Sequence, residues 1–352
     1  MKHISIGVTA LKTVESPQPG FGVARSLKDA GYKVVGIDDS CLTSAIVAPY
    51  FDAVYITNSL KTENFKTFKK FLLKIKEKEG IDVLIPCYDK DVFFFIKYKK
   101  EIEDMGIKLL IPSLRAIRVS SKPYLSEFKK YGILIPNTIV TSSEKELESA
   151  IKNLGLPLVC KGMIKDAYIA KNSSEVLTFF SKIRDIWNGG EGAVLLQQFL
   201  FGEYYCISGV ADYQNRIIRY AIMKKLAIDS KGTTWSGILI SNLRIKNIAD
   251  KIIKLLDWSG PFELEFIKEQ QTKKYYLFEI NPRLPSWVYL ATIGGQNLPK
   301  IIIDILYKNK ITGKCTYKNN LMFTRLANEI IYPASKIKTE KFANLKLSDA
   351  EV

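Results

Sequence analysis

The sequence has very little of what most nucleophilic or metal-dependent active sites require. It contains a single histidine, His3, in 352 residues, which argues against Ser–His–Asp or Cys–His catalysis and against histidine-rich metal sites. Its five cysteines lie far apart and form no CxxC pair, so neither a zinc site nor a disulfide framework is indicated. Any chemistry must therefore use carboxylates, lysines, arginines, backbone groups and a hard metal ion.

Long apolar runs are also missing. None reaches the roughly 20 residues that a helix needs to cross a bilayer. The N-terminal stretch MKHISIGVTAL alternates apolar residues as a strand does, and it lacks the charged region and long apolar region of a leader. We therefore expect a cytoplasmic protein that does not contact a membrane.

The charge balance is strongly basic, with a net charge of +16. Such a balance suits nucleic acid, anionic membranes or phosphorylated ligands. The lysines, however, are spread through stretches such as FKTFKKFLLKIKEKEG, where they alternate with glutamates, as on a solvated helix surface. No RNP motif, zinc finger or basic zipper is present, so nucleic acid is not an expected partner.

The first third of the chain repeats a strand–helix–strand pattern. ISIGVTA and the stretch ending at Asp38 predict two strands, and Gly20 and Gly22 precede a helix between them. FDAVYIT, IDVLIPCYD and IKLLIPS predict further strands of a doubly wound parallel sheet. A strict GxGxxG is absent, which favours a Rossmann-like support domain over an NAD site.

Acidic residues follow one of these predicted strands. In IPCYDKD, Asp89 and Asp91 come directly after the strand that ends near Pro86. The carboxyl ends of strands in such sheets face the ligand crevice. The two acids therefore belong either to a ligand site or to a turn and helix cap.

Two lysines and a polar strand end mark the middle of the chain. Lys122 precedes Pro123 in a helical stretch, and Lys161 ends a short predicted strand. Each is either a surface lysine or an anion ligand. The strand AVLLQ runs into Gln197 and Gln198 before the next strand begins. Backbone groups at this junction can read a purine edge, or the junction is only a sheet connection.

The most informative block is a predicted hairpin of two acid-bearing strands. PFELEFI places Glu263 and Glu265 on one face, and KKYYLFEINPR places Glu279 and Asn281 on one face. An antiparallel hairpin then brings together ligands that suit Mg²⁺ rather than zinc. Arg283 at the strand end can grip a carboxylate or phosphate. A solvated face with scattered charge is the alternative.

In this order, the motifs resemble the ATP-grasp superfamily, and in particular its carbamoyl-phosphate-synthetase-like carboxylate–amine ligases. GPFELEFI and FEINPR are similar to the metal-binding strands of the family, and LLQQFLFGE is similar to its adenine hinge. The implied fold is α/β and α+β, with an N-terminal Rossmann-like preATP-grasp domain followed by a two-lobed ATP-grasp fold. The implied parts are residues 1–112 (preATP-grasp domain), 113–200 (small lobe), 201–335 (C-terminal lobe with the metal site) and 336–352 (tail).

The resemblance also implies a reaction. An ATP- and Mg²⁺-dependent ligase would join a small acid, amino acid or peptide to an amine through an acylphosphate, and would release ADP and phosphate. Glu265, Glu279 and Asn281 would bind Mg²⁺, with Mn²⁺ as an alternative ion, and Arg283 would be the catalytic residue that contacts the acylphosphate or the acid. The expected assembly is a homodimer.

Residues from several segments are implied to hold ATP. Glu203 competes with Tyr204 for the ribose hydroxyls, and Lys224 competes with Lys225 for the γ-phosphate. The full expected set is Lys122, Lys161, Gln197, Gln198, Phe199, Leu200, Glu203 and Lys224.

Other functions stay open at this level. The family's glycine-rich phosphate flap corresponds to KGMIKDAYIAKNSS, where Gly162 is the one glycine, and this favours a nucleotide-binding sensor or scaffold. A carboxylate–thiol ligase fits the same residues. Trp235, Trp287 and Tyr289 either line an acceptor pocket or belong to the core, and Arg325 is a second candidate anion anchor.

Overall fold

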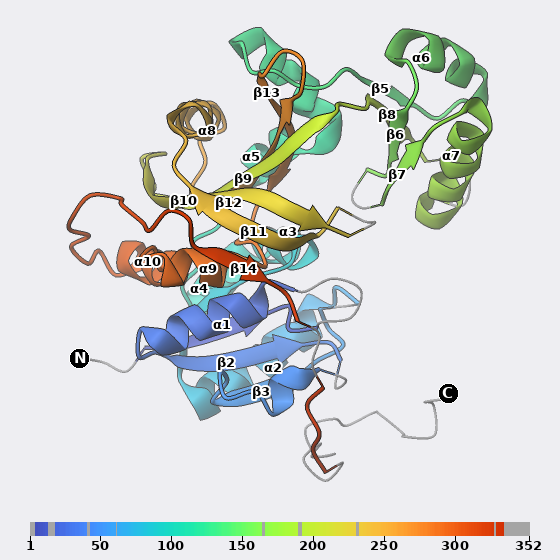
Figure 1. Ribbon diagram of the computed structural model, residues 1–352. Coiled ribbons are helices and arrows are strands. Elements are labelled where there is room, and N and C mark those ends of the chain that lie inside the picture. Colours follow the sequence, from blue (N-terminus) through green and yellow to red (C-terminus); the bar gives the residue numbers. More distant parts are fainter. Residues whose placement is uncertain are drawn as a thin grey trace.

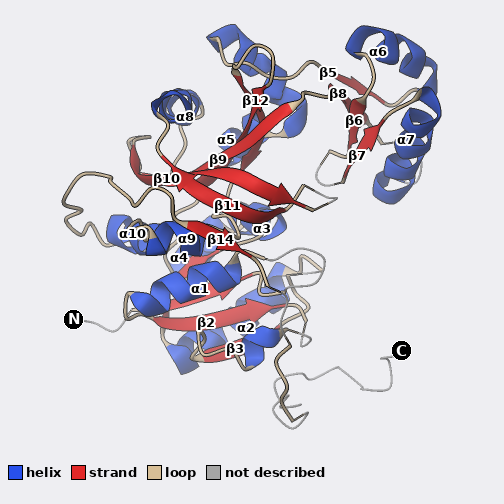
Figure 2. Cartoon of the chain, in the orientation of Figure 1, coloured by secondary structure: helices blue, strands red, loops and turns tan. Residues whose placement is uncertain are grey.

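Three β-sheets organise the chain (Figures 1 and 2). One is parallel and lies in the N-terminal part, and the other two are antiparallel. No helix in the described residues has the length and apolarity to cross a membrane. This computed structural model describes residues 4–12, 18–40, 43–60, 62–163, 166–188, 192–229, 232–326 and 329–333.

The N-terminal sheet has four parallel strands in the order β3-β2-β1-β4. Its central strands are buried on both faces, because α1 covers one face and α2 and α3 cover the other. The strands are β1 (Ser5–Thr9), β2 (Lys33–Asp38), β3 (Ala53–Ile56) and β4 (Ile81–Ile85). The helices are α1 (Gly20–Asp29), the 3₁₀ turn η1 (Ser44–Ile46), α2 (Phe65–Glu79), α3 (Asp89–Lys97) and α4 (Lys99–Asp104).

The strand predicted for IKLLIPS is wrong. This segment makes one isolated parallel bridge, between Val83 and Lys108, and then leaves the sheet. Its apolar side chains are buried in two different cores, with Leu110 in one and Leu109 and Ile111 in the other. The apolar run therefore reflects a connection that crosses the interior, and not a strand.

The two early glycines lie inside the first turn of α1, not before the helix. A Cβ on Gly20 would lie 2.4 Å from the carbonyl oxygens of both Thr9 and Ala10. The amide of Gly20 also donates to the Ala10 oxygen at 3.2 Å. The glycine therefore allows α1 to start directly against the end of β1, a packing role that agrees with a support domain.

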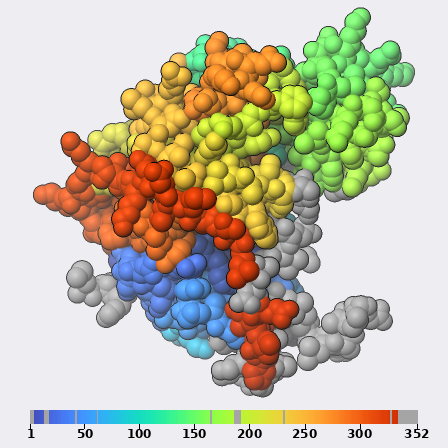
Figure 3. Space-filling model, viewed as in Figure 1, coloured from blue at the N-terminus to red at the C-terminus, as the bar shows by residue number. Residues whose placement is uncertain are grey.

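A small antiparallel sheet projects from the side of the molecule, in green in Figure 3. Its order is β5-β8-β6-β7, and α6 and α7 pack on it around a separate apolar core. The elements of this region are β5 (Thr138–Thr141), η3 (Glu144–Glu146), α6 (Leu147–Leu154), β6 (Leu158–Lys161), β7 (Ala167–Ala170), α7 (Ser173–Asn188) and β8 (Val194–Gln198). Before them, α5 (Leu114–Ser120) and the 3₁₀ helix η2 (Lys122–Tyr131) pack in the core of the six-stranded sheet with α8 (Leu243–Leu255).

The larger antiparallel sheet has six strands in the order β13-β12-β9-β10-β11-β14. Alternate residues of β9 enter two cores: Tyr205 and Ile207 pack with α8, while Cys206 and Val210 pack with α1, α9 and α10. The elements are β9 (Gly202–Ala211), β10 (Ile217–Ile228), β11 (Thr234–Ile240), α8 (Leu243–Leu255), β12 (Gly260–Glu269), β13 (Tyr275–Asn281), α9 (Val288–Ile293), α10 (Leu298–Leu306) and β14 (Met322–Thr324).

The second of these cores joins the N-terminal part to the six-stranded sheet, and we call it the shared core. It includes residues of β1, α1, β9, β10, α9 and α10. Representative members are Val8, Val23, Leu27, Cys206, Val210, Met223, Leu290 and Ile302.

Gly20→Ala is expected to lower the free energy of unfolding by about 1–3 kcal/mol, because the new methyl group meets two backbone oxygens that cannot rotate away. Gly22→Ala is the matched control, since its Cβ would lie 3.0 Å from the Val288 side chain and no closer than 3.6 Å to the backbone of Ser286 and Tyr289. It should stay within about 1 kcal/mol of the parent. Thermal and urea unfolding measure both. Equal stability of the two variants would contradict this reading of Gly20.

Candidate active site

The predicted hairpin of acid-bearing strands forms at the edge of the six-stranded sheet. Glu265 lies opposite Glu279, and Glu263 lies opposite Asn281. On its other side, β12 pairs with β9, so that Cys206 lies opposite Glu265. The ladder thus gathers three carboxylates, an amide and a thiol on adjoining strands.

A β-bulge shapes this hairpin. Glu265 pairs with Glu279 and the next residue, Phe266, pairs with Leu277, so Phe278 has no partner in the ladder. The Phe278 ring lies 6.0 Å from the ring of Tyr204, and the ammonium of Lys161 lies 5.2 Å from the Phe278 ring centre. The bulge therefore brings an aromatic ring beside the carboxylates, a placement that no sequence pattern signalled.

The carboxylates are compensated by cations and by an amide. Lys225 Nζ lies 2.6 Å from Glu265 Oε2, and Lys122 Nζ lies 3.4 Å from Glu279 Oε1. The Nδ2 of Asn281 donates to Glu263 Oε2 at 3.2 Å and to Glu265 Oε1 at 3.4 Å. An N–H₂ group that bridges two carboxylates occupies a position suited to a cation. Half a turn of this amide would present its oxygen instead, so these hard ligands fit Mg²⁺.

The pKa values in this cluster diverge. Burial, helped by the neighbouring charge of Glu265, raises the pKa of Glu263 to about 7. Burial also opposes ionisation of Glu279, but the surrounding cations outweigh it and lower the pKa of that carboxyl. Those cations are Lys122, Lys161, Lys225 and Arg283.

Lys161 and the expected adenine hinge lie side by side. Lys161 Nζ donates to Gln197 Oε1 at 2.8 Å, and the Gln197 amide donates to Thr138 Oγ1 at 3.0 Å. Burial lowers the pKa of Lys161 to about 8. An anion bound beside Lys161 would stabilise the protonated form of the lysine, so the two would bind each other favourably.

The rest of the expected hinge begins at Gln198, the last residue of β8, and continues beyond that strand. Gln198 pairs through its backbone amide with the Asn137 oxygen at 2.8 Å, and Leu200 is buried. The rings of Phe199 and Phe201 pack edge to face at 4.8 Å, and Phe201 is exposed. The residues expected to form the hinge thus lie at the junction between the small sheet and the six-stranded sheet.

The structure does not bring Glu203 and Lys224 to the carboxylates. They form an ion pair with each other, and the Tyr205 hydroxyl donates to Glu203 at 2.8 Å. Lys224 lies opposite Tyr205 in the ladder, and this face of the strands is the one away from Cys206. Their neighbours Tyr204 and Lys225 face the site instead.

Arg283 joins the hairpin to the N-terminal part. Its Nε donates to Asp89 Oδ2 at 3.1 Å, and its Nη1 lies 3.5 Å from Glu263 Oε2. Asp89 and Asp91 both lie in the first turn of α3, but Asp91 is buried and accepts from Thr9 Oγ1 at 2.6 Å. One acid of IPCYDKD therefore reaches the site, and the other binds within the N-terminal sheet.

The remaining candidates, Trp287, Tyr289 and Arg325, make separate contacts and do not line one pocket together. Trp287 is buried and donates from Nε1 to Glu263 Oε1 at 2.8 Å. Tyr289 packs under the guanidinium of Arg25, which lies 3.7 Å from its ring centre. Arg325 donates from Nη2 to Ser286 Oγ at 2.8 Å. The expected tail, 336–352, lies outside the described residues.

No family model matches the chain. The chain is 26% identical over 337 residues to the carbamoyl phosphate synthase large chain of Thermoanaerobacter pseudethanolicus, covering 87% of this chain and 30% of that relative. The same protein of Thermotoga maritima is 21% identical over 364 residues, covering 95% of this chain and 32% of the relative. The chain thus spans about 30% of the length of the curated relatives it matches.

Solved structures share the fold. The biotin carboxylase domain dimer of Hydrogenobacter thermophilus 2-oxoglutarate carboxylase, in complex with MgADP, ADP and bicarbonate, matches with a TM-score of 0.68 and 16% identity, over 89% of this chain and 72% of that chain. The L-amino acid ligase of Bacillus licheniformis matches with a TM-score of 0.64 and 14% identity, over 88% and 75%.

The chain is a distant homologue of the carbamoyl phosphate synthase large chain, and it shares its fold with these solved ATP-grasp structures. The resemblance and the fold class expected from the sequence are therefore confirmed: a parallel N-terminal sheet precedes the two antiparallel sheets of an ATP-grasp fold.

The lowered pKa of Lys161 has a measurable consequence for stability. Between pH 8 and pH 10.5 the unfolded chain binds more protons at this lysine than the folded chain does, so its contribution to stability rises with pH. Lys161→Met should remove up to about 3 kcal/mol of this rise. Urea unfolding of parent and variant at pH 7.5 and pH 10 measures the difference. The exposed Lys145→Met is the control, and parallel pH profiles for parent and Lys161→Met would contradict the prediction.

Proposed function

We propose that the protein is an ATP- and Mg²⁺-dependent carboxylate–amine ligase that forms an acylphosphate and releases ADP and phosphate. One observation carries the proposal: the hard ligands Glu265, Glu279 and Asn281 lie together, ringed by Lys122, Lys161, Lys225 and Arg283. Acids for a metal and cations for phosphates are the two requirements of phosphoryl transfer. The relatives support this choice, since one solved neighbour is an L-amino acid ligase.

In this proposal the nucleotide lies between the small lobe (113–200) and the C-terminal lobe (201–335). Gln197, Gln198, Phe199 and Leu200 hold the adenine through the hinge. The rings of Phe278 and Tyr204 pack 6.0 Å apart, and they would lie beside the nucleotide on the side of Lys161. Tyr204 is nearer to the site than Glu203, so we assign it the ribose contact.

The phosphates would be held by lysines from separate elements. Lys122 comes from η2, Lys161 from β6 and Lys225 from β10. Each already neighbours an acid or amide of the site, and a triphosphate would replace those contacts with stronger anionic ones. When bound, Mg²⁺ neutralises the phosphate charge that develops during transfer.

Arg283 is placed to orient the acid substrate. Asp89 and Glu263 hold its Nε and Nη1 sides, while its Nη2 makes no hydrogen bond within the described residues. That nitrogen can bind the substrate carboxylate beside the γ-phosphate. The carboxylate takes the phosphoryl group, the amine then displaces phosphate, and the chain positions the groups and stabilises charge without a protein nucleophile.

A weak nucleotide-binding sensor or scaffold is the second candidate, and the single Gly162 in the phosphate flap favours it. A carboxylate–thiol ligase is distinguished by a thioester product. Incubation with MgATP, pooled carboxylates and pooled amines separates the three: ADP with an amide product supports the proposal. A homodimer is part of the proposal, since the Hydrogenobacter domain is a dimer.

Glu279→Gln should reduce ADP formation by roughly a hundredfold or more, because it removes a charged metal ligand from the centre of the cation ring. The fold should survive, as the amide keeps the shape of the carboxylate. ADP release in the pooled-substrate assay and circular dichroism measure the two effects. Glu77→Gln, on the exposed face of α2, is the control. Full turnover by Glu279→Gln would sink the metal assignment.

Adjacent lysines of β10 give a matched pair. Lys225 pairs with Glu265, whereas Lys224 pairs with Glu203 on the other face. Lys225→Met should weaken binding of the Mg²⁺ complex of a non-hydrolysable ATP analogue by about tenfold, since a lost charge–phosphate contact costs about 1.4 kcal/mol or more. Lys224→Met should bind as the parent does. Calorimetric titration distinguishes them, and the reverse order would return the phosphate role to Lys224.

A further inference from the structure

A thiol lies among the site carboxylates, and no step of the proposed reaction uses it. Cys206 is a free cysteine that is completely buried. It lies opposite Glu265 in the ladder of β9 and β12. Within the part of the chain that the structure describes, its Sγ makes no hydrogen bond. Cys206 is also a member of the shared core, so its sulfur lies between apolar side chains and the site carboxylates.

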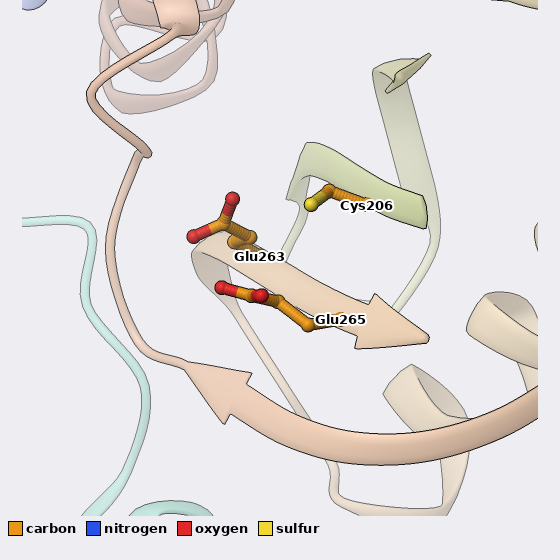
Figure 4. A group of neighbouring side chains, drawn as sticks. All are labelled: Cys206, Glu263 and Glu265. Carbon is orange, nitrogen blue, oxygen red and sulfur yellow. The ribbon is translucent and has the colours of Figure 1, made fainter. Parts of the chain in front are cut away.

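The strand geometry points this thiol at two acids. The Sγ of Cys206, one oxygen of Glu263 and one oxygen of Glu265 all lie within 4.8 Å of one another. Figure 4 shows the three side chains leaving the adjoining strands on one side, with the sulfur and the carboxylates directed toward a common space. Because successive side chains alternate along a strand, the backbone itself fixes this grouping.

Each glutamate has one firmly held oxygen and one that is weakly held. Glu265 Oε2 pairs with Lys225 at 2.6 Å, and Glu263 Oε1 accepts from Trp287 at 2.8 Å. The other two oxygens share the Nδ2 of Asn281, at 3.2 and 3.4 Å. Glu263 Oε2 also lies 3.5 Å from Arg283 Nη1. A cation between the glutamates therefore displaces the Asn281 amide and shifts this arginine contact, and it leaves the shorter contacts to Lys225 and Trp287 in place.

We propose that Cys206, Glu263 and Glu265 form a binding site for a divalent cation of borderline softness, of which Zn²⁺ is the type. A thiolate selects such ions against Mg²⁺. Zn²⁺ with three protein ligands and one water is a known coordination, with Zn–S of about 2.3 Å and Zn–O of about 2.0–2.2 Å. The three ligand atoms would need to approach one another from their present spacing to reach these lengths. The thiol proton passes to solvent as the metal–sulfur bond forms.

The site shares Glu265 with the hard ligands Glu279 and Asn281. Zn²⁺ and Mg²⁺ would therefore compete for one carboxylate, and a thiophilic ion would lower the occupancy of the Mg²⁺ position. Sequence alone does not lead to this site, since Cys206 has no CxxC partner. The inference does not depend on ligase activity, because the metal is probed directly.

Cobalt titration tests the proposal, since Co²⁺ replaces Zn²⁺ and reports a sulfur ligand by its colour. Adding Co²⁺ to the reduced full-length protein should produce an ultraviolet thiolate-to-cobalt charge-transfer band. Zn²⁺ should abolish the band, while an equal concentration of Mg²⁺ should leave it. Cys206→Ser should abolish it, and Glu263→Gln should keep the band but raise the Co²⁺ midpoint by roughly tenfold.

Cys315→Ser is the matched control, because Cys315 is the more exposed thiol among the described free cysteines. It should keep the band, and circular dichroism should show that each variant is folded. A band that survives Cys206→Ser, or that is lost in Cys315→Ser, would overturn the assignment, as would the absence of any band in the parent. If Cys206→Ser does not fold, an unshifted midpoint in Glu263→Gln overturns it instead.

Discussion

The neutralisation of buried acids by buried cations is the constraint on which the rest of the structure depends. Glu263, Glu265 and Glu279 lie on two adjacent strands at a spacing where they repel. A buried, uncompensated charge costs several kcal/mol, so each element that supplies a cation must reach the hairpin. Lys225 comes from β10, and Arg283 follows β13. As a result, η2, β10 and the segment after β13 all bring a cation to the acids of the hairpin.

Much of this arrangement could be predicted because its determinants are local. The period-two acids of PFELEFI and FEINPR define a face whatever the rest of the fold does, and the short polar turn between the strands fixes an antiparallel hairpin. The same holds for the strand–helix alternation of the first third. The sequence also identified the acids of IPCYDKD as candidates, but it could not predict that Asp89 contacts Arg283 while Asp91 binds Thr9. Which of Asp89 and Asp91 reaches Arg283 depends on how α3 packs against the six-stranded sheet.

The remainder depends on contacts that are distant in sequence. Lys224 and Lys225 are chemically identical, and only the register between β9 and β10 decides which of them faces the acids. The choice between Glu203 and Tyr204 has the same origin. The bulge at Phe278 follows from the pairing of β13 with β12. The segment around Leu110 has the composition of a strand, but it packs in the shared core as a connection instead. For the two pairs Lys224/Lys225 and Glu203/Tyr204, a shift of one residue exchanges the two faces of a strand.

The shared core has a consequence for how the molecule divides mechanically. Val8 and Val23, from the N-terminal part, pack in one cluster with Val210 and Met223 of the six-stranded sheet. The small sheet instead has a core of its own. The boundary that fewest core contacts cross therefore does not lie at the end of the N-terminal sheet. The small sheet shares least of its core with the rest of the molecule. A chain cut after residue 112 would take the β1 and α1 side chains out of the shared core and expose their partners on β9 and β10.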